Sequence, residues 1–153
     1  MQLSNNEHTY NGTTGTDGSV TLNAVDGDYT YTITKTNYTD VSKSVSVSKD
    51  QTISVTMHIK TGTVSISVLD QNDGGVANAV ITLTDTTKST NKFSTSASGT
   101  GSSGGASISG VSYGTYKITL DLTNATGYTA PTSIDNLTVD SSTETLNIKV
   151  TKN

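Results

Sequence analysis

The stretch Thr63-Val-Ser-Ile-Ser-Val-Leu69 decides the fold class of this chain. Its apolar residues Val64, Ile66 and Val68 alternate with hydroxyl-bearing residues, and residues two apart lie on the same face of a β-strand. The stretch Thr52-Ile-Ser-Val-Thr-Met57 repeats this alternation, and no stretch shows helical spacing over any length. We therefore expect an all-β protein whose strands bury one face and expose the other to water.

Turn-forming residues divide the chain into short strands of this kind. Gly, Asn and Asp separate the alternating stretches, a pattern typical of hairpins and sandwiches. We expect strands at residues 2–5, 19–25, 28–35, 43–48, 51–59, 63–69, 78–86, 91–97, 105–111, 115–123, 134–139 and 143–151.

The sequence contains an internal repeat. The segment Gly18-Ser-Val-Thr-Leu22 corresponds to Gly105-Ala-Ser-Ile108, and Gly27-Asp-Tyr29 corresponds to Gly114-Thr-Tyr116. Alternating apolar positions continue the match into the last predicted strand of each copy. Two copies of one unit is the economical interpretation, so we expect two tandem immunoglobulin-like β-sandwiches.

The join between the copies lies at Lys60-Thr61-Gly62. It divides the chain into a first module at residues 1–60 and a second module at residues 61–153. Three residues are too few for a flexible tether, so we expect the two modules to act together as a rigid spacer.

The two copies differ at their start. The second begins with strand 63–69, then a turn, then the strand that contains Leu83, whereas Leu3 of the first copy aligns with Leu83. The first module is therefore expected to lack its opening strand, which would leave backbone groups unpaired. Three explanations stay open: the chain is a fragment of a longer tandem array, a neighbouring subunit supplies the strand, or the loss is tolerated.

Composition excludes several classes of function. Ser and Thr make up about a third of the chain, which suits sheets with hydroxyl-coated outer faces. The net charge is −4 and all nine basic residues are Lys, so nucleic acid is a poor partner. The chain has no Cys, which removes disulfides and thiolate chemistry, and no stretch approaches the roughly 20 apolar residues of a membrane span.

Five segments together resemble a known family. They are Val64-Ser-Ile-Ser-Val68, Asp70 to Gly75, Ala79-Val-Ile-Thr-Leu83, Gly114-Thr-Tyr116 and Gly127-Tyr128. They are similar to the collagen-adhesin B-type and carboxypeptidase-regulatory-like, or prealbumin-like, repeats of microbial surface and phage virion proteins. The resemblance covers residues 63–150 well and residues 1–59 less completely. It implies seven-stranded immunoglobulin-like sandwiches strung along an extracellular, cell-surface or virion-surface protein.

Many collagen-adhesin B-type repeats carry an intramolecular isopeptide bond between a Lys of the first strand and an Asn of the last. In this chain Val68 stands at the Lys position, and Tyr116, Ile118 and Leu120 occupy the inner face of the strand that usually carries the promoting carboxylate. Asp121 is expected to point outward. We therefore predict no isopeptide bond. The prediction stands although two Asn lie in or after the last strand, Asn147 and Asn153.

Two enzyme-like spacings overlap in one loop, where Gly99 to Gly104 fits a dinucleotide-binding pattern and Gly101 to Gly105 fits a nucleophile elbow. Both chemistries need a following helix, and a strand at 105–111 is expected instead, so we interpret the loop as a Gly/Ser connection. The two imidazoles, His8 and His58, have no carboxylate at a suggestive spacing and make no zinc site alone.

Two acidic groups could in principle hold a cation. The segment Asp70-Gln-Asn-Asp-Gly-Gly75 is rich in oxygen ligands, but it lacks the downstream Glu of a calcium loop, and a β-turn explains it more simply. A second group consists of Asp17, Asp26 and Asp28, whose counterparts in the second copy are not acidic. We therefore expect no metal and no other cofactor.

Tyrosines are the remaining binding candidates, because amphipathic aromatic rings contact both sugars and proteins. Tyr29, Tyr31 and Tyr116 are expected to point inward, which leaves Tyr10 and Tyr113 freer for a ligand. Four glycosylation sequons also occur, but a chain this rich in Ser, Thr and Asn yields about four by chance. They begin at Asn11, Asn37, Asn124 and Asn136.

These observations favour a non-catalytic structural or adhesive module, either a rigid spacer or an adhesin repeat, with neighbouring modules or subunits as protein partners. A first alternative is a subunit of a filament or capsid decoration, assembled by strand donation into the first module. A second alternative is a carbohydrate-binding appendage that contacts surface glycans. The sequence singles out no catalytic residue, and the ligand-binding residues stay unknown.

Overall fold

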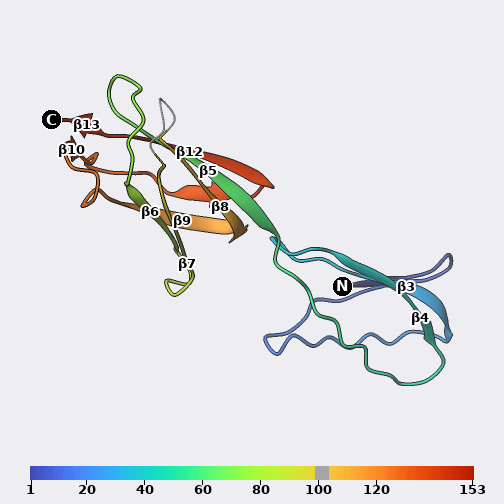
Figure 1. The fold of residues 1–153 in the computed structure, drawn as a ribbon. Helices are drawn as coiled ribbons and strands as arrows, with labels where there is room; N and C mark the ends of the chain where they lie inside the picture. The colour runs from blue at the N-terminus through green and yellow to red at the C-terminus, as the bar shows by residue number, and fades with distance from the viewer. Residues whose placement is uncertain (99–103) are drawn as a thin grey trace. The chain divides into compact units, whose positions relative to one another are not determined.

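The computed structural model describes residues 1–98 and 104–153, and every regular element within those ranges is a β-strand (Figure 1). The expected all-β class is thereby confirmed. No helix capable of crossing a membrane occurs within these ranges. The chain forms two compact units, Met1–Ile59 and Lys60–Asn153, which we call the first unit and the second unit.

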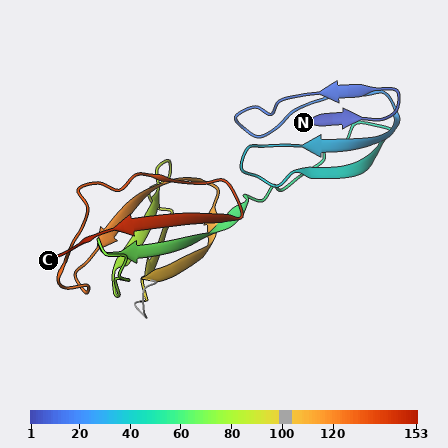
Figure 2. The same ribbon diagram turned by 90° about the horizontal axis from the view of Figure 1, so that it is seen from above.

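The second unit is a β-sandwich (Figure 2). One of its sheets has the strand order β11-β9-β6-β7, the other has the order β12-β5-β8, and a two-stranded ladder joins β10 to β13. The strands are β5 (Thr61–Leu69), β6 (Val80–Asp85), β7 (Lys92–Ser96), β8 (Gly105–Ser112), β9 (Gly114–Asp121), β10 (Tyr128–Thr129), β11 (Leu137–Val139), β12 (Thr143–Lys149) and β13 (Thr151–Lys152).

Strand β5 is the centre of the three-stranded sheet, where it runs parallel to β12 and antiparallel to β8. Its alternating residues Val64, Ile66 and Val68 are at most 2% exposed, as the period of two predicts. They belong to one buried cluster with Ile81 and Leu83 of the facing sheet. The core of the second unit therefore lies between the two sheets, with β5 on one side and β6 on the other.

Strand β5 begins at a point of close backbone approach. A side chain on Gly62 would collide with the backbone carbonyl of Ser141, and next to it the Thr63 amide donates to the Ser142 carbonyl at 3.0 Å. The Gly62→Ala variant should therefore lose about 1–3 kcal/mol of unfolding free energy in urea titrations. Gly114→Ala is the matched control, because its new methyl group would meet only the Tyr116 ring, at 3.8 Å. Equal losses in both variants would contradict this account.

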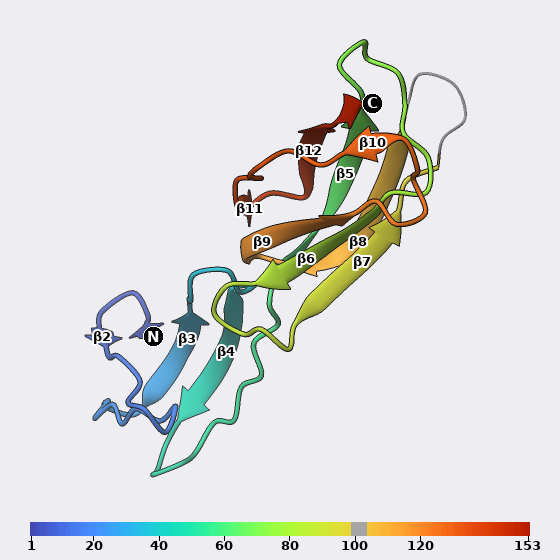
Figure 3. The same cartoon turned by 90° about the vertical axis from the view of Figure 1, so that its left-hand side faces the viewer.

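The first unit contains one sheet with the strand order β2-β1-β3-β4 (Figure 3). Its strands are β1 (Gln2–Ser4), β2 (Thr9–Asn11), β3 (Gly27–Ile33) and β4 (Val41–Val47). Leu3, Tyr29 and Tyr31 form its small buried cluster. The inward position predicted for the two tyrosines is confirmed, because they are 3% and 5% exposed.

This sheet has the same register as the β11-β9-β6-β7 sheet of the second unit. Leu3 lies opposite Tyr31 and Tyr10, just as Leu83 lies opposite Ile118 and Phe93. The next ladder of each sheet, β3 with β4 and β9 with β11, is equivalent too: Tyr29 opposite Val45 corresponds to Tyr116 opposite Leu137. The correspondence read from the sequence therefore holds residue by residue across this sheet.

One tyrosine contact occurs identically in both units. The Tyr29 hydroxyl donates to the Val25 carbonyl at 3.0 Å, and the Tyr116 hydroxyl donates to the Ser112 carbonyl at 2.8 Å, four residues back in each case. Each ring also meets, edge to face, an aromatic ring from the strand two places away in the same sheet: Tyr10 of β2 in the first unit and Phe93 of β7 in the second. These contacts fix the same corner in both units.

Two predicted strands are wrong. Residues 19–25 and 51–59 keep the alternating side-chain pattern, but neither segment forms a strand in the structure. The reverse also occurs, since the short strands β2 and β10 lie where no strand was expected. Their Tyr-containing segments have too few alternating residues for the periodicity to reveal them.

Candidate functional site

The loop after β5 is organised around Asp70, the one buried polar or charged side chain among the described residues. Asp70 is 6% exposed, and its Oδ1 accepts hydrogen bonds from the backbone amides of Asn72 and Gly74, both at 2.8 Å. A Cβ at Gly74 would lie 2.8 Å from the Asp70 carboxylate, so a larger residue there would displace that carboxylate. The carboxylate thus serves its own turn, as an Asx-type turn does, and this supports the turn interpretation over a calcium loop.

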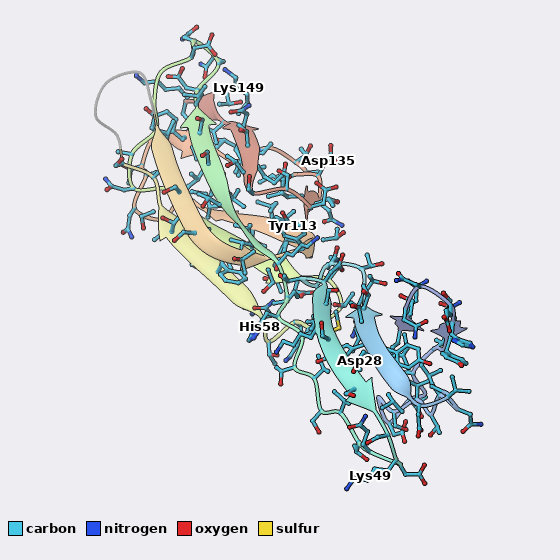
Figure 4. The ribbon with its side chains drawn as sticks, turned by 90° about the vertical axis from the view of Figure 1, so that its right-hand side faces the viewer. Asp28, Lys49, His58, Tyr113, Asp135 and Lys149 are labelled. Carbon is cyan, nitrogen blue, oxygen red and sulfur yellow. The ribbon has the colours of Figure 1, made fainter. Side chains whose placement is uncertain are left out.

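An ion pair and hydrogen bonds hold the same loop against β12 and β13. Lys149 of β12 forms an ion pair with Asp73, and its Nζ also donates to the Asp70 carbonyl at 3.4 Å. The Lys152 amide donates to Oε1 of Gln71 at 2.7 Å. Figure 4 labels Lys149 beside this loop. Because the Lys149–Asp73 pair is largely exposed, we expect it to orient the loop rather than to contribute much stability.

The Asp70 turn makes stability depend on pH. Hydrogen bonds from the Gly74 and Asn72 amides hold the pKa of Asp70 below its ordinary value of 3.8. The turn's contribution is therefore complete above the unfolded-state pKa and is lost as pH falls through the lower folded-state pKa. The Asp70→Asn variant should show a smaller fall in thermal midpoint between neutral and strongly acidic pH than the parent chain. Thermal unfolding of the two chains at several pH values measures this, and equal falls in both would contradict the account.

The histidines do not form a metal site. Both lie in the first unit: His8 stacks on Tyr10 with ring centroids 6.1 Å apart, whereas His58 is exposed. Asp17 accepts from the amide and hydroxyl of Ser19, and this lowers the Asp17 pKa. Among the residues that the structure describes, no three His, Cys, Asp or Glu side chains converge on one point.

Three acidic residues of the first unit, Glu7, Asp26 and Asp28, border a shallow open hollow of about 340 Å³. Asp26 and Asp28 line one side of it, with Asp28 labelled in Figure 4. The other side is the turn at Asn5, whose Oδ1 accepts from the amides of Glu7 and His8 at 3.0 and 2.7 Å. The hollow is open and polar, unlike the enclosed and mostly apolar pockets that usually bind small molecules.

The tyrosines proposed as freer are packed more closely than expected. Tyr10 is half-buried against the Tyr29 ring at a centroid distance of 6.0 Å, and Tyr113 packs against the core of the second unit. Tyr116 is fully buried, as predicted. Tyr10 and Tyr113 are more exposed than the three buried tyrosines, as expected, but both rings are half-buried and packed. The sequence pattern does not reveal this packing, because it reveals neither strand β2 nor the contacts at the start of β9.

The isopeptide positions carry groups that cannot form the bond. Val68 is fully buried opposite Ile148 of β12, and Tyr116 and Ile118 fill the inner face of β9. Asp121 is exposed, as predicted, and accepts hydrogen bonds from Thr123.

We predict that the intact mass of the chain will equal the sum of its residues. Lysine and asparagine each need the other and a buried carboxylate to form the cross-link, and Val68 supplies no amine at the position where the family carries one. High-resolution mass spectrometry of the denatured chain measures this directly. A deficit of one ammonia would contradict the prediction, and peptide mapping around Asn147 and Asn153 would then locate the bond.

The enzyme-like spacings fall mostly outside the described residues, since residues 99–103 are not among them. Gly105 begins β8, so the strand expected after the glycines is confirmed. Gly104 has a φ of +39°, and a side chain on it would collide with the Val68 carbonyl. The last two glycines of the motif thus belong to the packing of β8 against β5.

The structure adds one feature that motif reasoning did not single out as a site. Residues 19–25 and 51–57 of the first unit present apolar side chains at alternate positions, but neither segment is paired with a strand of the described ranges. In the sequence, the unequal start of the two copies indicates that the first copy lacks a strand. It does not show that these two segments stay unpaired.

Comparisons with known proteins identify the fold family. The model of the SpaA prealbumin-like fold domain matches residues 62–153. Among curated proteins, none matches this sequence. This family match confirms the resemblance to prealbumin-like repeats.

Solved structures give the same fold. The Bacillus anthracis TIE protein is similar over 99% of this chain and 30% of its own, with a TM-score of 0.71 and 18% identity. The group B streptococcus pilus 2b backbone protein is similar over 86% of this chain and 52% of its own, with a TM-score of 0.50 and 14% identity. This chain thus matches between 30% and 52% of the length of these two proteins. On the match that covers 62–153, the chain belongs to the SpaA prealbumin-like fold domain family.

Proposed function

We propose that this chain is a non-catalytic structural module on the outside of a Gram-positive cell, where it acts as a rigid spacer or an adhesin repeat. The observation that carries the proposal is the family match over residues 62–153, which places a prealbumin-like sandwich in the second unit. Fold alone does not give function, so the proposal also needs the chemistry of the surface.

The surface chemistry supports a structural role. The carboxylates with lowered pKa values, among them Asp70, Asp85 and Asp121, receive their hydrogen bonds from neighbours in their own turns. Groups held in this way stabilise loops and are poorly placed to act on a substrate. The outward faces of the strands carry Ser and Thr, as in Ser65 and Thr145 of the three-stranded sheet. Such a surface stays soluble without the large apolar patches of an obligate interface.

The cell surface is favoured over the virion surface by the named relatives. One is a pilus backbone protein of a streptococcus and another is a protein of Bacillus anthracis. A role in a pilus or a similar assembly would make other protein subunits the partners of this chain. The low identity of both relatives means that they support the fold, while the location is our proposal.

The proposal is tested by locating the chain on intact cells. Antibodies raised against the 153-residue chain should label unpermeabilised producer cells, and brief protease treatment of those cells should remove the label. A cytoplasmic enzyme assayed in parallel should stay intact. Label that appears only after permeabilisation would overturn the surface role.

Adhesion is distinguished from spacing by binding assays. A spacer predicts no saturable binding of the isolated chain to glycan arrays or host matrix proteins, whereas an adhesin repeat or carbohydrate-binding appendage predicts it. We favour the spacer, because Tyr10 and Tyr113 are packed and the hollow beside Asn5 is open and polar. Saturable glycan binding would instead favour the alternative that the chain is a carbohydrate-binding appendage.

A further inference from the structure

The first and the last long strands of the second unit lie side by side. Strand β5 opens this unit and β12 comes near its end, yet the two strands are neighbours in one sheet and run parallel. Figure 2 shows them as arrows that point the same way, β5 in green and β12 in red. Seven residue pairs join them, from Thr143 opposite Thr63 to Lys149 opposite Leu69. The backbone therefore enters the unit at one end of this ladder and reaches Lys152 beyond the other end.

Backbone hydrogen bonds extend the β5–β12 ladder at both ends. At its start the Thr63 amide donates to the Ser142 carbonyl at 3.0 Å. At its end the Val150 amide donates to the Leu69 carbonyl at 2.9 Å. In a parallel pair the bonds between these two points are evenly spaced. The two strands are thus held in register along the full length of the ladder.

The inward side chains of the two strands belong to one core. Ile66 lies opposite Leu146, and Val68 lies opposite Ile148. Ile66, Val68 and Ile148 are at most 3% exposed, and Leu146 packs against the same cluster. A slip of one residue cannot re-form the ladder, since it would set the inward residues of one strand against the outward residues of the other. Packing and hydrogen bonds therefore oppose the same sliding motion.

The loop that follows β5 adds contacts to the strands at the far end of the ladder. Lys149 forms an ion pair with Asp73, and the Lys152 amide donates to Oε1 of Gln71 at 2.7 Å. Strand β13 is also paired with β10, where Tyr128 lies opposite Lys152. A pull on Lys152 thus reaches the unit through these contacts and through the ladder together.

The direction of a pull decides how such a ladder fails. A pull that separates the start of β5 from the end of β12 acts along both strands, which is shear, and it loads all seven pairs at once. A pull that separates two points at the same end of the ladder acts across the strands and opens one pair after another. Because a single backbone hydrogen bond contributes little by itself, the number of bonds loaded together sets the resistance.

We propose that the second unit is a force-bearing element, in which the parallel β5–β12 ladder carries tension between Lys60 and Lys152 in shear. A spacer transmits tension only while its units stay folded, and this ladder lies directly between the two points of attachment. The use of the ladder under tension rests on the proposed role as a spacer. Its resistance to shear is a property of the second unit itself.

The test is single-molecule force spectroscopy on the full 153-residue chain. The chain has no Cys, so two introduced thiols define the points of attachment. Lys60→Cys with Lys152→Cys pulls the ladder in shear, whereas Lys60→Cys with Ser142→Cys pulls it from one end. All three side chains are exposed. Both pairs of thiols lie within the second unit, so the first unit is outside the pulled segment in each case.

The two pulling directions should give different unfolding forces. At equal pulling speed we expect the shear pair to unfold at a force about twofold or more above that of the end pair, because seven pairs break together. A length gain of about 250–300 Å identifies each event as unfolding of the second unit. Urea unfolding of the two double variants should give equal unfolding free energies, which separates resistance in one direction from overall stability.

A pair of proline variants tests the ladder bonds themselves. The Ser142 carbonyl and the Val150 amide both face β5, so the even-numbered residues between them face β5 too. Strand β12 is at the edge of its sheet, so the Thr145 amide faces away from β5. In the shear direction, Glu144→Pro should lower the unfolding force, because proline removes a ladder donor, whereas Thr145→Pro should change it less. If Glu144→Pro fails to fold, the comparison of the two pulling directions still decides the proposal.

Contrary results overturn the proposal directly. Equal unfolding forces in the two directions, or a lower force in shear, would mean that the ladder does not carry the tension. Equal effects of the two proline variants would mean that the resistance does not come from the bonds between β5 and β12. Failure of the immunolabelling experiment would remove the spacer role and would leave the difference between the two pulling directions unchanged.

Discussion

Replacing Tyr116 by alanine should lower the unfolding free energy of the second unit by about 3–5 kcal/mol. The ring is fully buried between the two sheets and belongs to the largest cluster of the chain. It meets Phe93 edge to face at a centroid distance of 5.9 Å. Removing the ring would leave a cavity that the surrounding strands cannot close, because both sheets are held by their ladders.

The Tyr116→Phe variant separates the hydroxyl from the ring. It keeps the packing and removes only the hydrogen bond to the Ser112 carbonyl, so a loss of about 1 kcal/mol is expected. The equivalent Tyr29→Phe should lose a similar amount in the first unit, because its hydroxyl makes the same bond to the Val25 carbonyl. Urea unfolding followed by hydrogen exchange in β3 and β9 reports the two units separately. A Tyr116→Ala loss no larger than that of Tyr116→Phe would contradict the packing account.

The strands β6, β7, β9 and β11 could be predicted from the sequence, because their residues alternate and turn residues separate them. Their order in the sheet could not. The inward positions of Tyr29, Tyr31 and Tyr116 follow from the same period. Strand ends were less predictable: the sequence indicates strand to residue 123, whereas β9 ends at Asp121, whose carboxylate accepts from the Thr123 amide and starts a turn. A local side-chain hydrogen bond therefore ends the ladder where periodicity alone does not.

Residues 19–25 and 51–59 show why periodicity is insufficient for a strand. Alternation sets which side chains face the core, and the half-buried Leu22 and Val55 follow it. A strand also needs a neighbour for its backbone groups, and that neighbour is specified by a different part of the polypeptide. The sequence of these two segments therefore predicts their side-chain orientation but cannot predict their pairing.

The candidate site was predictable to a similar extent. The turn at Asp70 was recognised from its residue types, because Asp followed by Asn and Gly satisfies backbone amides locally. The packing of Tyr10 was missed, since it depends on strand β2, which is only three residues long. The periodicity of the sequence does not predict contacts between residues that lie far apart in the chain.

A charge on the buried face of β5 should unfold the second unit. In the Val68→Asp variant a carboxylate would replace a fully buried methyl pair between β8 and β12, and no described cation lies inside that core. An uncompensated buried charge costs about 3–5 kcal/mol, and loss of the buried valine adds about 1.5–3 kcal/mol. This sum is comparable with the whole stability of a small domain, about 5–15 kcal/mol.

The matched variant Ser65→Asp places the same charge on the same strand three residues earlier, on the exposed face. It should change the unfolding free energy by no more than about 0.5 kcal/mol, because the charge stays in water. Circular dichroism and hydrogen exchange in β8 and β12 measure both variants. Loss of protection in Val68→Asp together with retention in Ser65→Asp would show that β5 holds its sheet together through its inward residues. Equal tolerance of both charges would mean that the sheet does not depend on the inward apolar residues of β5.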